Sequence, residues 1–269
     1  MTESFSALEW SRRGGVALRV LYHATVRAVR VAHPNAALAI LFEILRALTL
    51  VIAIMAFLHV LDIQQMLLRG NAMVSVLSGV SLFLIHTGAM SAAFGAAGSG
   101  RALRHPGLSP MILTIAEALA SLYVQVLALI VGLSLVHLAY APVQIDDPAG
   151  ATLALALAWF SGVGAGVLAG SMRPLAPKFM QIVVSFYARG NMFFSGKLVL
   201  AAGLSALVLP YFLWNPLFHC IDQARGAVFI NYTARVTTLT YPAVFGAVCF
   251  LFGMMIRHRL QMNARLFNL

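Results

Sequence analysis

The chain has 269 residues, of which 61% are hydrophobic and only 10% are charged, and its formal net charge is +10. Soluble domains contain about 45–50% apolar residues, so this composition, with a mean hydropathy of +0.89, excludes an ordinary soluble domain. The positive charge does not indicate nucleic-acid binding, because the basic residues are dispersed over separate segments rather than gathered on one face.

The first thirty residues alternate charged and apolar side chains, so we expect no signal peptide with a continuous apolar core. Apolar residues recur at helical spacing, with arginines on the other side: Leu18, Leu21, Tyr22, Thr25 and Val29. The pattern predicts an amphipathic helix within residues 1–35 that lies in the cytoplasmic membrane interface and contacts membrane lipids. The alternative is a solvated basic tail.

Six apolar stretches follow, and crossing a bilayer takes about 20 such residues. They are Ala36–Leu61, Ala72–Ala97, Ile112–Tyr140, Ala151–Ser171, Ile182–Leu209 and Tyr241–Ile256. We therefore expect an all-α polytopic protein whose residues 36–269 form one six-span membrane domain. Of the 18 Lys and Arg residues, twelve fall on the side that the two termini would share and four on the other. The positive-inside rule then places both termini in the cytoplasm.

Three features within the spans stand out. Glu43 and Arg46 are three residues apart in the first span, a spacing that allows them to neutralise each other on one helical face. Glu117 in the third span is interpreted as a structural partner of a basic group. Four glycines of the fourth span form overlapping small-xxx-small repeats, which allow close helix contact within the chain or between subunits: Gly162, Gly164, Gly166 and Gly170.

The region from Phe193 to Thr240 is too apolar for an external loop and too interrupted by glycine and proline for two complete spans. Irregular backbone at membrane depth is tolerated only where it is buried in protein or faces water. We therefore expect short re-entrant helices between spans five and six.

Several kinds of site are not supported by the sequence. The segment Gly190–Leu198 has five residues between its glycines where a phosphate-binding loop needs four. The eight histidines include no close pair on a helical face, so no metal site is expected, and Cys220 and Cys249 are interpreted as packing residues. A membrane enzyme acting on lipid carriers is disfavoured, because the acidic residues are scattered.

One run of unusual residues carries a resemblance to a known family. Trp214-Asn215-Pro216-Leu217 is followed at fixed offsets by His219, Asp222, Arg225 and Ala227-Val228. This spacing resembles the W-N-P-L-x-H-x-x-acid-x-x-R-x-A-V run of capsular polysaccharide export permeases, which belong to the ABC-2 transporter class. The first span departs from the family pattern: Glu43 matches its glutamate, but the expected tryptophan and proline are missing.

The resemblance implies a cytoplasmic coupling segment that docks on an ATPase subunit. The basic connector between spans two and three corresponds to it, with Arg101, Arg104, His105 and Pro106. Aromatic and basic residues around the re-entrant region are candidates for the substrate pathway, with membrane-interface anchoring as the alternative for each aromatic ring. The candidates are Tyr187, Arg189, Phe193, Phe194, Lys197, Trp214, Asn215, Pro216, His219 and Arg225.

The resemblance thus implies a multi-pass permease of the bacterial inner membrane that exports lipid-linked capsular polysaccharide. It would act as a homodimer with a separate ABC ATPase subunit, which would bind the ATP and magnesium, and with periplasmic export proteins as further partners. This chain itself would hold no cofactor and catalyse no reaction. Alternative cargoes are O-antigen, a teichoic-type polymer, or a smaller lipid or drug.

Overall fold

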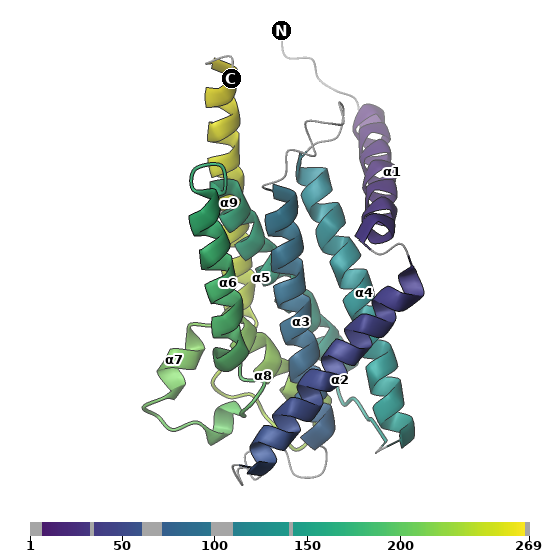
Figure 1. The fold of residues 1–269 in the computed structure, drawn as a ribbon, viewed down its shortest axis with the longest axis vertical. Coiled ribbons are helices and arrows are strands. Elements are labelled where there is room, and N and C mark those ends of the chain that lie inside the picture. The colour runs from purple at the N-terminus through teal and green to yellow at the C-terminus, as the bar shows by residue number, and fades with distance from the viewer. Residues whose placement is uncertain (1–6, 33–34, 61–71, 98–109, 140–141, 267–269) are drawn as a thin grey trace.

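The computed structural model of the chain describes residues 7–32, 35–60, 72–97, 110–139 and 142–266, and every regular element in them is helical. The helices are α1 (Ala7–Ala32), α2 (Ala36–Val60), α3 (Ala72–Ala97), α4 (Pro110–Ala139), α5 (Pro148–Met172), α6 (Pro177–Phe194), α7 (Leu209–Leu213), α8 (Pro216–Val228) and α9 (Thr240–Leu266), with a 3₁₀ turn at Ala201–Gly203. Figure 1 shows most of the long helices running along one axis, with α2 oblique to them and α7 and α8 toward one end.

Five of the described helices are long and apolar enough to cross a membrane, which confirms the expected transmembrane character. These segments are Ile40–Val60, Ala72–Ala97, Pro110–Ala139, Pro148–Met172 and Thr240–Met262. They match five of the six stretches expected from hydropathy. The continuous apolar runs are sufficient to predict these helices because a backbone surrounded by lipid must satisfy its own hydrogen bonds.

The stretch Ile182–Leu209, expected as the fifth span, is not one continuous helix. Helix α6 begins earlier, at Pro177, and ends at Phe194. Gly196 follows with a φ of 77°, a left-handed conformation that favours glycine and ends helices. The remainder of the stretch is irregular backbone with the 3₁₀ turn, so the apolar run overestimates the length of this helix.

Helix α3 is the centre of the bundle. In its most apolar window 83% of the residues are buried inside the protein, compared with 17% in α2, so α2 leaves most of its apolar surface for lipid. Helix α3 contacts α5, α4, α2 and α8, and α5 also packs against α9. Helix α3 therefore connects α2, α4, α5 and α8, and α5 connects α3 to α9.

The glycine repeat of α5 makes close contacts within the chain. A Cβ atom on Gly162 would overlap the carbonyl oxygen of His86 in α3, and one on Gly166 would overlap that of Met90. A Cβ atom on Gly164 would overlap the carbonyl oxygen of Gly246 in α9. The repeat therefore allows α5 to approach a helix on each side, where dispersion contacts replace the hydrophobic effect that lipid cannot supply.

Helix α1 is continuous and packs against α4, and Figure 1 shows it alongside one part of that helix. Leu21, Thr25 and Val29 are partly buried, as the amphipathic pattern predicts. Leu18 and Tyr22, assigned to the same apolar face, are 68% and 66% exposed. The apolar face is therefore divided between α4 and the surroundings, and its contact with the membrane interface stays a prediction.

Candidate functional site

The segment between α6 and α9 folds back against the bundle through two short helices. Gly196 follows α6, and a Cβ atom there would lie 2.5 Å from the Phe218 ring, so only glycine fits. Pro216 begins α8, and the Asn215 side chain caps it by accepting a hydrogen bond of 3.0 Å from the Leu217 amide. Proline at the first helical position after an Asn cap is a strong helix-start signal.

Asn215 also attaches α8 to α6. Its Nδ2 donates to Asn191 Oδ1 at 2.8 Å and to the Phe194 carbonyl at 2.9 Å. Asn191 in turn donates to the Tyr187 carbonyl at 3.1 Å. One side chain of the motif therefore sets both the start of α8 and its position beside the end of α6.

His219 of α8 links the end of α7 to the residues just before α9. Its Nε2 lies 2.9 Å from the Leu213 carbonyl, and its Nδ1 accepts from the Thr238 amide at 3.1 Å. Because a carbonyl can only accept, Nε2 carries the proton and the ring is the neutral tautomer. Its ring packs against Tyr241, whose hydroxyl donates to the Trp214 carbonyl at 3.0 Å.

Asp222 is 2% exposed and holds the segment that follows α8. It accepts hydrogen bonds from the Tyr232 hydroxyl and, at 2.7 Å, from the Thr237 hydroxyl. Burial, followed by the bond and charge of Asp222, raises the pKa of Tyr232 above its usual value. The contact between Asp222 and His219 that helical spacing allows is replaced by these two partners.

Arg225 is buried as well, with 1% of its surface exposed. It donates to three carbonyls of the turn after α6, those of Gly196 at 2.8 Å, Val199 at 3.0 Å and Lys197 at 3.1 Å. Buried backbone carbonyls need such partners because the interior offers no water. Arg225 therefore supplies the hydrogen bonds that the carbonyls of this turn would otherwise receive from backbone amides of a helix.

Lys197 has no exposed surface. Its Nζ lies 3.3 Å from the centroid of the Phe83 ring of α3 and 3.1 Å from the sulfur of Met192. In the part of the chain that the structure describes, neither Lys197 nor Arg225 makes a salt bridge. Both basic side chains are thus held by neutral partners, an aromatic face for one and carbonyl dipoles for the other.

An aromatic groove of about 510 Å³ lies beside this structure. Helix α6, the α7–α8 corner and α9 form its walls, with Ile182, Val183, Phe186, Tyr187, Gly190, Asn191, Phe194, Tyr211, Trp214, Asn215, Pro216 and Phe245. None of these residues is charged. Three rings stand well exposed, since Phe186 is 77%, Tyr211 72% and Trp214 82% exposed.

The groove brings together half of the ten residues predicted for the substrate pathway. Tyr187, Phe194, Trp214, Asn215 and Pro216 line it. Arg189 and Phe193 are exposed on α6 but are not among the lining residues. Lys197, His219 and Arg225 are buried in the protein, where each is bound by its neighbours. Their contact with a substrate stays a prediction.

Sequence reasoning did not select Asn191 or Phe245 for the groove. Asn191 lies four residues after Tyr187, so the two share a face of α6, and this spacing was the available signal. Phe245 lies in α9, far away in the sequence, and no local pattern connects it with α6.

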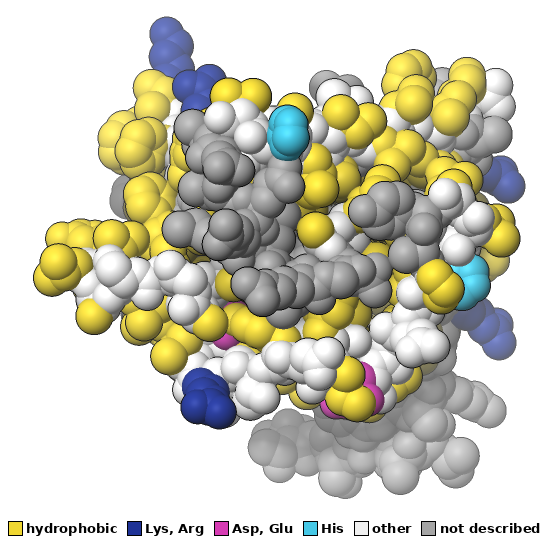
Figure 2. All heavy atoms as spheres, turned by 90° about the horizontal axis from the view of Figure 1, so that it is seen from below, with side chains coloured by type: hydrophobic (Ala, Val, Ile, Leu, Met, Phe, Trp, Pro, Cys, Tyr) yellow, Lys and Arg dark blue, Asp and Glu magenta, His cyan; other side chains and the backbone are white. Residues whose placement is uncertain are grey.

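Figure 2 views the molecule from the end near which α7 and α8 lie, where hydrophobic side chains cover much of the described surface. Leu207 is 85% exposed and Ile230 is 77% exposed. Large apolar side chains with this much exposed surface are unusual in a connecting segment that is surrounded by water. This surface favours an environment of lipid or protein for the segment between α6 and α9.

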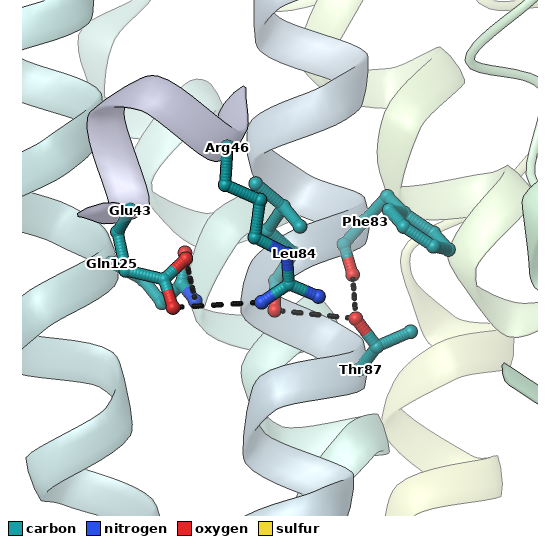
Figure 3. Close-up of polar contacts among 6 residues, drawn as sticks. All are labelled: Glu43, Arg46, Phe83, Leu84, Thr87 and Gln125. Atoms are coloured by element: carbon teal, nitrogen blue, oxygen red, sulfur yellow. Dashed lines mark hydrogen bonds and ion pairs between the residues drawn. The ribbon is translucent and has the colours of Figure 1, made fainter. Parts of the chain in front are cut away.

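A second polar group of residues joins α2 to α4 (Figure 3). Glu43 forms the expected ion pair with Arg46, at 3.5 Å, and accepts a hydrogen bond of 3.2 Å from Gln125 of α4. Glu43 and Gln125 line a small cavity of about 140 Å³ together with Glu117 and Ser121. Hydrogen bonding of this kind accommodates a charge among apolar helices.

The predicted coupling residues Arg101, Arg104, His105 and Pro106 lie outside the described residues. In the described ranges no three His, Cys, Asp or Glu residues are grouped so that they could hold a metal ion. No protein-family model matches the sequence, and no curated protein matches it either. The resemblance to the capsular export permeases therefore depends on the motif residues themselves.

Proposed function

We propose that this chain is the membrane-spanning subunit of an ABC exporter that moves lipid-linked capsular polysaccharide across the bacterial inner membrane. A separate ATPase subunit would bind ATP and magnesium and dock on the connector that contains Arg101 and Arg104. Two copies of the chain would form the conduit. The aromatic groove carries this proposal, because Trp214, Asn215 and Pro216 of the resemblance motif line one of its walls.

The chemistry of the groove suits a glycan. Aromatic faces pack against the C–H faces of sugar rings, and the side-chain oxygen atoms of Asn191, Asn215 and Tyr187 can accept hydrogen bonds from sugar hydroxyls. The lining holds no charged side chain that would trap a long polymer at one point. Such a wall allows successive sugar units to occupy equivalent positions as the chain advances.

The hydrogen bonds of the motif explain why its polar residues are needed at those offsets. Asn215, His219, Asp222 and Arg225 each bind backbone or side-chain groups of the segment around α8. Irregular backbone can enter a bilayer only if its polar groups are satisfied within the protein. These bonds support α7 and α8 as re-entrant helices. In the proposed arrangement α6 would be the fifth of six crossings, and both termini would lie in the cytoplasm.

Two experiments test the proposal. Extraction of the native protein with a mild detergent is expected to co-purify an ATPase subunit that hydrolyses ATP. In the host bacterium, Tyr187→Ala combined with Phe194→Ala is expected to lower surface polysaccharide while the variant still assembles with its ATPase. Phe252→Ala is the matched control, because Phe252 is 55% exposed on α9 outside the groove.

Two results would count against the proposal. A purified protein without any ATPase companion removes the energy source. Undiminished export by the double groove variant, with normal expression, removes these aromatic residues from the pathway.

A further inference from the structure

His86 lies directly behind the groove, at the point where three helices meet. It belongs to α3 and has no exposed surface. Its Nδ1 is 3.0 Å from the Ala158 carbonyl and 3.2 Å from the Ser161 hydroxyl oxygen, both of α5. Its Nε2 is 3.1 Å from the Tyr187 hydroxyl of α6. One imidazole ring therefore connects the bundle centre to a groove wall.

The partners of His86 determine where its proton lies. The Ala158 carbonyl can only accept, so Nδ1 must carry the hydrogen. The Ser161 hydroxyl donates to the same carbonyl at 3.1 Å, which leaves its oxygen free to accept from Nδ1 as well. In the neutral ring Nε2 is then an acceptor. The Tyr187 hydroxyl must therefore donate to Nε2, and its proton points into the protein.

The position of the ring is held by backbone contact. The carbonyl oxygen of His86 lies only 2.3 Å from the position that a Cβ atom on Gly162 would take, so the backbones of α3 and α5 are in direct contact at this level. Well-packed interiors of this kind do not deform continuously. His86 thus offers Tyr187 a fixed acceptor, and the Asn191 amide, which donates to the Tyr187 carbonyl, holds the same residue from the groove side.

We propose that His86 is a positioning residue of the groove, which holds the Tyr187 ring in the wall with its hydroxyl proton turned toward α3. This inference rests on the proposed function and adds which kind of hydrogen-bonding group the groove binds at this point. With its proton engaged, the Tyr187 oxygen can act toward an occupant only as a hydrogen-bond acceptor. The groove then selects at this point for a hydrogen-bond donor, such as a sugar hydroxyl, and disfavours a group that can only accept, such as a carboxylate.

Paired substitutions of His86 separate positioning from packing. The carbonyl oxygen of His86→Gln can replace Nε2 as the acceptor for Tyr187. The shorter His86→Asn can keep the contact with α5 but leaves Tyr187 without a partner. The probe is a neutral glucose oligosaccharide, and the readout is the fluorescence emission of Trp214. The other two tryptophans are replaced by Trp10→Phe and Trp159→Phe. The full chain is reconstituted in lipid nanodiscs, together with its ATPase when one co-purifies.

We expect His86→Asn and Tyr187→Phe each to weaken oligosaccharide binding about three- to tenfold, the effect of one lost hydrogen bond. Their combination is expected to add nothing further, and His86→Gln is expected to bind within about twofold of the parent. Equal loss in the Gln and Asn variants, or additive loss in the double variant, would overturn the positioning role.

A second measurement does not depend on any ligand. ¹⁵N NMR of the histidine-labelled protein is expected to show His86 protonated at Nδ1, with an Nε2 resonance that moves when Tyr187 becomes Phe. Protonation at Nε2 would refute the inference even if the oligosaccharide binds. If the parent protein binds no oligosaccharide but His86 has the expected tautomer, the proposed function fails while the hydrogen-bond arrangement stands.

Discussion

The side chains of Asn215 and Asn191 are joined by a hydrogen bond of 2.8 Å, although they are 24 residues apart: Asn215 caps the start of α8, and Asn191 lies in the last turn of α6. This bond closes the corner between α6 and α8, and both residues line the aromatic groove. The residue that caps α8 therefore also defines the shape of the candidate site. Groove geometry and local folding cannot be altered independently at this position.

Asn215→Ala is expected to destabilise the protein by about 1–3 kcal/mol, because it removes a helix cap and the bonds to Asn191 and the Phe194 carbonyl. Asn215→Asp keeps the capping oxygen but lacks the donors, so its loss should be smaller. Unfolding in detergent, followed by circular dichroism, measures both. Asn231→Ala, at an exposed position, is the control, and equal stability of all three variants would contradict the role of Asn215.

Arg225→Met is expected to destabilise the protein by about 2–4 kcal/mol, because two buried carbonyls and one partly buried carbonyl lose their donor while the apolar volume is kept. Arg225→Lys should not restore stability, since one ammonium cannot reproduce the planar guanidinium fork. Thermal unfolding in micelles provides the measurement. Arg235→Met changes an exposed arginine of the same segment and should have little effect; a Lys variant as stable as the parent would refute the argument.

Gly162→Ala is expected to cost about 1–3 kcal/mol or prevent accumulation in the membrane, because its Cβ overlaps the backbone of α3. Gly95→Ala is the matched control within a helix, since nothing lies within 4 Å of its added Cβ. That substitution should be neutral or stabilise by up to about 1 kcal/mol. Expression and unfolding of both variants check the prediction, which does not survive if the two alanines behave alike.

Tyr232 is expected to make stability depend on alkaline pH. Its pKa is raised in the folded protein, so above about pH 10 the unfolded chain releases this proton while the folded chain keeps it. The free energy of unfolding should therefore fall, at about 1.4 kcal/mol per pH unit, as the pH rises toward the folded pKa. Tyr232→Phe should make the slope shallower by about this amount. Tyr211→Phe, at a 72% exposed position, should leave it, and equal slopes in all three proteins would contradict the role assigned to Tyr232.

Hydropathy predicted the boundaries of α3 without error and those of α2, α4 and α5 to within three residues, whereas α9 continues beyond the predicted end at Ile256 to Leu266. It failed for the stretch Ile182–Leu209, because a continuous apolar run does not reveal where the backbone turns. Gly196 follows the helix with a positive φ. A larger residue would not fit there, because the ring of Phe218, 22 residues later, occupies the space that its Cβ would need. A contact of that kind is absent from any local sequence window.

The candidate site was likewise predicted only in part. Of the aromatic members of the pathway prediction, Tyr187, Phe194 and Trp214 line one groove and Phe193 does not. Of the charged members, Arg189 is exposed, whereas Lys197 and Arg225 are buried among a ring, a sulfur and carbonyl groups. Residue type alone suggested that these cations would meet a substrate. Their burial follows from the needs of an irregular turn whose carbonyls have no helical partner.

Composition and the spacing of apolar residues determined that this chain forms membrane-crossing helices, because lipid forces each segment to satisfy its own backbone and that requirement is local. Only the tertiary structure decided which polar side chains are available to a ligand. Hydrogen bonds such as those of His86 with Tyr187 and of Arg225 with the Gly196–Val199 turn join residues from separate helices. Their existence depends on how closely those helices pack.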